Sequence, residues 1–137
     1  MKNTKLLIAA LLLNAAAATP ALAASNPLSV HVLNLQDGLP SAGVTVSLEK
    51  QVDDKWVSLN KGVTNEQGRI TALYPSESTM EKGNYRVTFQ TGEWFNQHKI
   101  STFFPEIPVI FKADGSVPHY HIPLLVSPYG FSSYRGN

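Results

Sequence analysis

Short runs in which apolar and polar residues alternate make up most of the chain beyond residue 24, and no long run follows a helical period. Val44, Val46 and Leu48, for example, are separated by single polar residues. A period of two is typical of a strand with one buried face. The other strand-like runs are 28–35, 56–59, 69–73, 85–89, 106–112, 119–126 and 129–135.

Turn signals separate these runs. They include Asp53-Asp54, Ser127-Pro128 and the stretch 65–68, whose final Gly68 can adopt a positive φ cheaply. Pro108 lacks a backbone donor and indicates an edge strand or a strand start. About eight short strands with such spacing predict an all-β sandwich. Only residues 93–98 favour a short helix.

The first predicted strand is apolar on both faces. Val30 and Val32 lie on one face, whereas His31, Leu33 and Leu35 lie on the other. A strand with two apolar faces is usually covered on both sides. The isolated alternative is a solvated strand histidine. We favour a second cover over the face with His31, and a partner subunit could provide it.

The N-terminus has the features of a secretory signal peptide. Lys2 and Lys5 precede an apolar run at 6–13, and an alanine-rich stretch ends in Ala21-Leu22-Ala23. That run is too short for a stable membrane anchor. We therefore expect a signal peptide at 1–23, one domain at 24–137, and a periplasmic location.

Composition excludes several function classes. Without Lys2 and Lys5, nine basic residues face ten acidic ones, a formal charge of −1. We therefore expect neither nucleic acid nor a membrane surface as partner. The chain has no cysteine, so an exported domain of this size must fold without disulfides, and oligomerisation is one way to bury more surface.

The C-terminal segment carries the strongest candidate chemistry. His119 and His121 lie two residues apart in a predicted strand and share a face, opposite the apolar residues Tyr120, Ile122 and Leu124. Same-face imidazoles can bind a metal, but no acidic residue lies at ligand spacing beside them. We therefore expect no metal at this pair.

Two further residues complete the candidates. Arg69 starts a strand directly after Gly68, where its guanidinium could hold a carbonyl, an enolate or a carboxylate, although a solvated turn arginine is the simpler alternative. Tyr134 is in phase with Gly130 and Ser132, which leave space beside its ring, although it could be an ordinary packing tyrosine. No nucleophile elbow, phosphate loop or carboxylate pair is present.

Together, four motifs resemble the 5-hydroxyisourate hydrolases, the transthyretin-related branch of the transthyretin fold. These motifs are Leu-Ser-Val-His-Val-Leu-Asn at 28–34, Gly-Arg at 68–69, His-Tyr-His-Ile-Pro-Leu-Leu at 119–125 and Ser-Pro-Tyr-Gly-Phe-Ser-Ser-Tyr-Arg-Gly at 127–136. The resemblance extends from Leu28 to the end of the chain. The family commonly closes with Tyr-Arg-Gly-Ser, whereas this chain has Asn137 in the last position.

The resemblance implies a transthyretin-like (prealbumin-like) sandwich of two four-stranded sheets with one short helix. It implies opening of the lactam ring of 5-hydroxyisourate to 2-oxo-4-hydroxy-4-carboxy-5-ureidoimidazoline, in urate degradation. His31, Arg69 and His121 would be catalytic, and the reaction would need no metal or cofactor. His31, Arg69 and Tyr134 would bind substrate. The assembly would be a homotetramer with its sites at the subunit interface.

Two other functions are compatible with a β-sandwich. A transthyretin-like carrier of a small ligand would need an apolar or lysine-lined channel, in place of two histidines and an arginine. An adhesion or chaperone sandwich would leave the three polar residues without a role. The sequence alone does not decide whether His31 or His121 activates the water.

Overall fold

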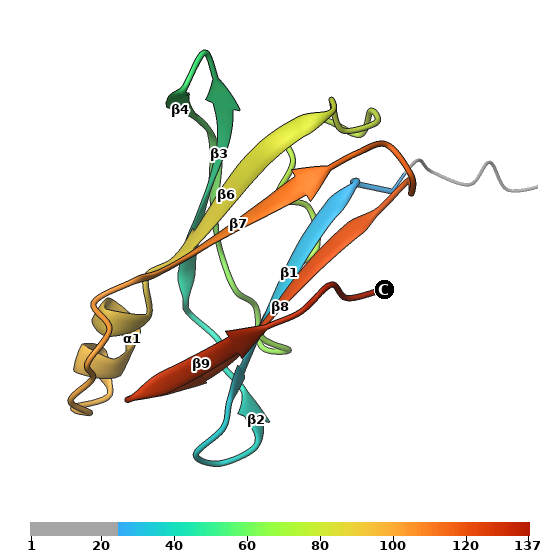
Figure 1. Cartoon of the computed structure of the whole chain (residues 1–137). Coiled ribbons are helices and arrows are strands. Elements are labelled where there is room, and N and C mark those ends of the chain that lie inside the picture. The colour runs from blue at the N-terminus through green and yellow to red at the C-terminus, as the bar shows by residue number, and fades with distance from the viewer. Residues whose placement is uncertain (1–24) are drawn as a thin grey trace, which may run out of the picture.

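Nine strands and one helix form the described part of the chain, residues 25–137, in a computed structural model (Figure 1). The predicted signal peptide lies outside these residues. In chain order the elements are β1 (Leu28–Asn34), β2 (Leu39–Pro40), β3 (Thr45–Val52), β4 (Lys55–Val63), β5 (Arg69–Ile70), β6 (Gly83–Phe89), α1 (Thr91–Gln97), β7 (Ile107–Ala113), β8 (Tyr120–Ser127) and β9 (Gly130–Ser133).

The strands form two sheets packed face to face (Figure 1). One sheet has the order β4-β3-β6-β7, and all its pairs are antiparallel. In the other sheet, β1 and β8 run parallel at the centre, β9 pairs with β8, and the short β2 and β5 pair with different parts of β1. Helix α1 lies at one end of the sandwich, directly after β6 (Figure 1).

The predicted sandwich is confirmed, with differences in detail. All eight predicted strands are present, and the helix expected at 93–98 spans Thr91–Gln97. The sequence missed β2, whose two residues are both exposed and so show no alternation. The sheet that contains it has five strands instead of the four expected. Strand β5 is shorter than expected because the chain leaves β1 after Ile70.

The core lies between the sheets and follows the predicted alternation. Val30 and Val32 of β1, together with Leu124 of β8, are fully buried against Val46 and the other inward residues of the second sheet. Tyr85, Phe89 and Phe95 are the largest fully buried side chains. A fully buried side chain of this kind stabilises the fold by roughly 1.5–3 kcal/mol.

Turn and edge residues also take the expected positions. Asp53 and Asp54, in the β3–β4 connection, have φ of 49° and 62°, as a two-residue hairpin turn requires. Pro108 lies in β7, the edge strand of its sheet, where no partner needs its missing N–H.

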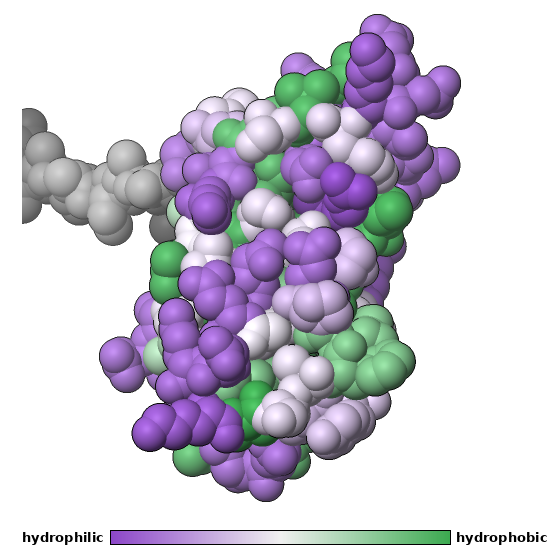
Figure 2. Space-filling model, turned by 90° about the vertical axis from the view of Figure 1, so that its left-hand side faces the viewer, coloured by the Kyte–Doolittle hydropathy of each residue, from purple (hydrophilic) through white to green (hydrophobic). Residues whose placement is uncertain are grey.

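Polar contacts and apolar side chains are both found on the surface of the sandwich. On the four-stranded sheet, Arg86 forms an ion pair with Glu49 at 2.8 Å and covers the ring of Trp56. The side of the molecule shown in Figure 2 is largely hydrophilic, with apolar residues in small scattered groups. In the described chain, no helix is both long and apolar enough to cross a membrane.

Candidate active site

Three neighbouring strands bring the sequence-predicted residues together. His31, in the middle of β1, lies directly opposite Arg69 of β5 and Pro123 of β8. Two residues earlier on β1, Ser29 lies opposite His121. Strand spacing and rise place the Cα atoms of His31 and His121 about 8 Å apart along this diagonal. The two histidines and the arginine therefore belong to one site.

All these side chains project from the outer face of the five-stranded sheet. We call this surface the histidine face. Neighbouring residues on β1 and β8 point into the core, so the face is set by the strand period. It consists of Ser29, His31, Leu33, His121, Pro123, Leu125, Ser132 and Tyr134 with the adjacent Arg69.

A tight turn brings Arg69 to this position. Gly68 has a φ of 71°, and its carbonyl accepts a hydrogen bond from the Val32 N–H at 2.8 Å. A Cβ at this glycine would lie 2.5 Å from the Val32 carbonyl oxygen. The Asn65 side chain accepts a hydrogen bond from the Arg69 N–H at 2.9 Å, which closes the turn.

The Arg69 guanidinium is available for a ligand. Its residue is exposed, and it forms no ion pair with an acidic side chain of residues 25–137. A planar guanidinium can donate two parallel hydrogen bonds to a carbonyl or carboxylate, and it stays charged throughout the working pH range.

The imidazole of His121 is held along two edges. Its Nδ1 lies 2.7 Å from the Ser29 hydroxyl, and its Cδ2 lies on the side of Gly136. His119 reaches the same hydroxyl with Nε2, at 2.8 Å. In the described chain, Nε2 of His121 has no hydrogen-bond partner, so this nitrogen is free to act on a ligand.

Both site histidines have lowered pKa values. Burial and the positive charge of Arg69 lower the pKa of His31. Burial, Arg69 and the two other nearby imidazoles lower the pKa of His121 in the same way. Both rings are therefore neutral at pH 7, in the form that can accept a proton. Within residues 25–137, the buried Nδ1 of His31 has no hydrogen-bond partner.

The C-terminal segment folds back along β8 beside His121. The Gly136 N–H donates a hydrogen bond to the His121 carbonyl at 2.9 Å. A Cβ at Gly136 would lie 2.5 Å from His121 Cδ2, so only glycine fits against this ring. The Tyr-Arg-Gly ending thus closes one side of the site.

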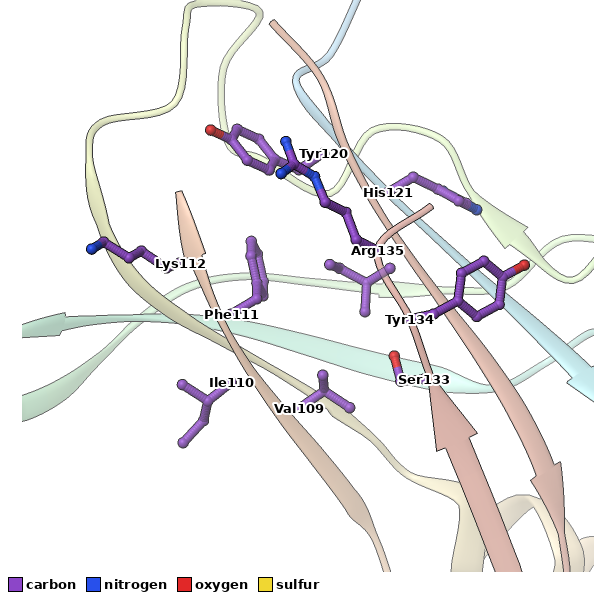
Figure 3. Close-up of a pocket in the computed structure, with 10 residues that line it drawn as sticks. Val109, Ile110, Phe111, Lys112, Tyr120, His121, Ser133, Tyr134 and Arg135 are labelled. Atoms are coloured by element: carbon purple, nitrogen blue, oxygen red, sulfur yellow. The ribbon is translucent and has the colours of Figure 1, made fainter. Parts of the chain in front are cut away.

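Tyr134 and Arg135 point to opposite sides of this segment. Figure 3 shows Tyr134 on the same side as His121, whereas Arg135 extends toward the ring of Tyr120, 5.9 Å from its centre. Tyr134 is 59% exposed, so its hydroxyl is accessible beside the histidines.

A cavity of about 310 Å³ lies next to the site, between β7 and the C-terminal segment (Figure 3). His121 and Tyr134 line it, but His31 and Arg69 do not. The cavity therefore does not contain the whole set of candidate residues. The open histidine face, which does contain them, is the better candidate site.

Sequence analysis missed one member of the site. Ser29 connects His119 with His121 through its hydroxyl, a contact that the alternation of apolar residues along its strand does not predict. The available signal was the period of two, because Ser29 shares its face with His31.

Known proteins with similar sequences include a protein family and its hydrolases. The HIUase/Transthyretin family matches residues 28–136. A 5-hydroxyisourate hydrolase of Salmonella typhi is 50% identical over 137 residues, which cover all of both chains.

Two solved structures are also similar. The 5-hydroxyisourate hydrolase of Klebsiella pneumoniae has a TM-score of 0.70 and 37% identity, covering 80% of this chain and 98% of that one. Sea bream transthyretin in complex with thyroxine has a TM-score of 0.75 and 28% identity, covering 80% and 94%.

Proposed function

Because the chain belongs to the HIUase/Transthyretin family, with half its residues identical to those of a 5-hydroxyisourate hydrolase, we propose that it hydrolyses 5-hydroxyisourate. The reaction opens the lactam ring to 2-oxo-4-hydroxy-4-carboxy-5-ureidoimidazoline. One structural observation carries this proposal: two neutral imidazoles share the outer face of one sheet with a guanidinium that has no acidic partner among residues 25–137.

Each group suits one demand of lactam hydrolysis. A neutral imidazole of His31 or His121 accepts a proton from the attacking water, and an imidazolium can return a proton to the leaving nitrogen. Arg69 binds the planar ring and stabilises the negative charge that develops on the carbonyl oxygen. Tyr134 adds a hydroxyl at the rim of the site.

A carrier function is the alternative, since sea bream transthyretin was solved with thyroxine on a similar fold. The composition of the histidine face favours hydrolysis. A site for a mainly apolar ligand gains little from two titratable rings beside a fixed positive charge, and these groups are costly to desolvate without a chemical role.

We also propose that hydrolysis needs no metal ion. The support is the position of the ring nitrogens: Nε2 of His119 and Nδ1 of His121 both contact the Ser29 hydroxyl, at 2.8 and 2.7 Å. These two nitrogens are thus engaged in hydrogen bonds within the protein. Activity should survive EDTA, and loss of activity that added metal restores would contradict this part of the proposal.

The active form is proposed to be a homotetramer whose subunits meet over the histidine face. In a single chain the site is open, with Leu33 and Leu125 half-buried around the polar residues. A second subunit would cover these leucines and exclude water from the site. Exclusion of water strengthens the electrostatic effect of Arg69 on the transition state.

We further propose export to the periplasm through a cleaved signal peptide at 1–23. The proposal depends on Lys2 and Lys5, the apolar run that follows them, and Ala21-Leu22-Ala23. The intact mass of protein from a periplasmic extract tests it. A mass that corresponds to a start at residue 24 is expected, and an uncleaved chain would contradict the proposal.

Kinetics on freshly generated 5-hydroxyisourate test the function directly. We expect turnover by the wild type, and losses of about 10²-fold or more for His31→Ala, Arg69→Ala and His121→Ala. The losses should not add, because the groups act together. Tyr134→Phe should cost less, since the ring remains.

The matched control is Arg86→Ala, which removes an arginine from the opposite sheet and should leave turnover unchanged. Thermal melts show whether each variant is folded. A wild type without turnover would refute the function, and near-wild-type turnover of His31→Ala or His121→Ala would refute the assigned mechanism.

A further inference from the structure

An uninterrupted line of hydrogen-bonding atoms leads from the protein interior to the ring of His121. It starts at the backbone carbonyl of Asn26, which lies 2.9 Å from Nδ1 of His119. Nε2 of His119 lies 2.8 Å from the Ser29 hydroxyl, which in turn lies 2.7 Å from Nδ1 of His121. Segments far apart in the sequence thus meet at one serine.

The Asn26 carbonyl is a fixed starting point. Asn26 is buried, and its side chain donates a hydrogen bond to the Tyr74 carbonyl at 2.7 Å and accepts one from the Leu28 N–H at 3.1 Å. A carbonyl oxygen can only accept a hydrogen bond. Nδ1 of His119 must therefore carry the proton.

The proton on Nδ1 of His119 determines which atom is the donor in the next two hydrogen bonds, at Ser29 and at His121. A neutral His119 protonated at Nδ1 has a lone pair at Nε2, so it accepts a hydrogen bond from the Ser29 hydroxyl. A hydroxyl has a single proton to donate, and Ser29 has then used it. The contact between Ser29 and His121 must therefore have Nδ1 of His121 as its donor.

The consequence concerns the reacting end of His121. A neutral imidazole protonated at Nδ1 has its lone pair on Nε2, the nitrogen without a partner in the described chain. Only in this tautomer can Nε2 accept a proton from water. Free histidine in water favours the opposite tautomer, with the proton on Nε2, so the selection must come from the protein.

We propose that Ser29 and His119 are positioning residues that hold His121 in the Nδ1–H tautomer and so make its Nε2 the general base. The proposal rests on the proposed hydrolase function, in which His121 acts on the water. It assigns the base role to one of two candidate histidines, and it gives His119 a function that needs no contact with substrate.

The ionisable groups around His121 fit this role. Arg69 of β5, His31 of β1 and His119 all face its ring and lower its pKa, and Tyr134 and Arg135 of the C-terminal segment line the adjacent cavity. No acidic side chain lies in this set, so the Ser29 hydroxyl is the group that accepts from Nδ1. When His121 takes a proton at Nε2, this hydrogen bond is kept.

Nuclear magnetic resonance of the imidazole nitrogens tests the tautomer without any assay of activity. In ¹⁵N-labelled wild-type protein at about pH 8, above the ordinary histidine pKa of about 6.5, we expect both His119 and His121 to carry the proton on Nδ1. Single histidine variants assign the signals. A wild-type His121 protonated on Nε2 would overturn the proposal, even if no variant folds.

Kinetics of Ser29→Ala test the effect on catalysis. We expect kcat to fall by about tenfold or more with KM changed less than about twofold, because the base is misaligned while the substrate contacts remain. In this variant His121 should shift toward the Nε2–H tautomer. Ser29→Thr keeps a hydroxyl on a β-branched residue suited to a strand, and should recover most of the activity.

Ser47→Ala is the matched control, since Ser47 is a half-buried strand serine on the outer face of the other sheet. It should leave kcat and the His121 tautomer unchanged. A Ser29→Ala variant with wild-type kcat would overturn the positioning role. So would a fall in kcat without a change of tautomer, since that is the result of a merely structural role. Failure of the hydrolase function itself is seen separately, as a wild type without turnover.

Discussion

At the scale of single residues, the site depends on charge as much as on shape. Arg69 keeps a positive charge beside two histidines, so protonation of either ring brings like charges together. Partial burial adds to this effect because it removes water that would stabilise an imidazolium. Both contributions favour the neutral rings that a general base requires.

The pH dependence of hydrolysis follows from these shifts. Since the pKa values of His31 and His121 are lowered, both rings stay neutral below the ordinary value of about 6.5. The acidic limb of the kcat/KM profile should therefore have its midpoint below about pH 6.5. Steady-state kinetics across this range measure it, and a midpoint above that value would contradict the assignment.

Removing the charge of Arg69 gives a second measure of how far it lowers the pKa values of the two histidines. In Arg69→Ala the pKa values of His31 and His121 should rise, whereas Arg86→Ala on the other sheet should not move them. Titration of the histidine resonances by nuclear magnetic resonance follows each ring. The same shifts affect the stability of the fold. In the unfolded chain His31 and His121 have the ordinary pKa and bind protons more readily than in the folded chain, so the free energy of unfolding falls as the pH decreases below about 6.5.

At the scale of elements, two short pieces of backbone place the groups that we propose to be catalytic. The turn before β5 fixes the start of that strand against β1, and the C-terminal segment fixes one edge of His121. Each depends on a glycine at a position where a side chain would meet neighbouring atoms. The two glycines can be tested against glycines in similar but open positions.

Gly68→Ala should destabilise the fold by at least about 3 kcal/mol, because it combines an unfavourable positive φ with a clash against the Val32 carbonyl. Gly38→Ala is the matched control. Gly38 has a nearly equal φ of 73° but no atom within 4 Å of its added Cβ, so only the conformational cost of about 1–2 kcal/mol should appear. Urea denaturation measures both, and equal losses would contradict the role of the clash.

Gly136→Ala should reduce kcat by about tenfold or more with little effect on thermal stability. The added methyl group would push the C-terminal segment away from His121, but it would not touch the core. Gly130→Ala, in the neighbouring β9, adds the same methyl group with only the Ser127 hydroxyl at 3.8 Å and should leave kcat unchanged. If both variants have wild-type kcat, the segment does not support the site.

At the scale of the whole molecule, the histidine face is the surface that we propose a second subunit covers. Leu33 and Leu125 lie beside its charged and polar groups, and a single chain leaves both leucines partly open to water. The outer face of the other sheet carries the ion pair of Arg86 with Glu49, and it also has exposed apolar side chains, Ile110 and Val63. What sets the histidine face apart is that its half-buried leucines surround the candidate site, so a subunit that covers them also covers the site.

Leu125→Glu should weaken the proposed tetramer, because a carboxylate buried between subunits without a partner is costly. Ser47→Glu, on the outer face of the four-stranded sheet, is the control and should assemble like the wild type. Sedimentation velocity at micromolar concentration compares the three proteins. A wild type that sediments as a monomer would contradict assembly over the histidine face, as would a Leu125→Glu tetramer of undiminished stability.

The sequence by itself determined the elements and the choice of faces. A period of two along Val30 and Val32, or along Ile122 and Leu124, is enough to separate core from surface, because a strand alternates its side chains regardless of its partners. The same period put His31 and His121 outside the core. Gly68 marked its turn for the same local reason, since positive φ is a property of one residue.

Only the tertiary structure decided which strands lie side by side, and so which groups meet. The parallel pairing of β1 with β8 places Ser29 against His121, and the two-residue β5 places Arg69 against His31. Both residues of strand β2 are exposed, so the alternation of apolar and polar residues does not predict this strand. Local alternation carries no information about strand order or about hydrogen bonds between distant segments. The line from Asn26 through His119 and Ser29 to His121 therefore exists only in the folded chain.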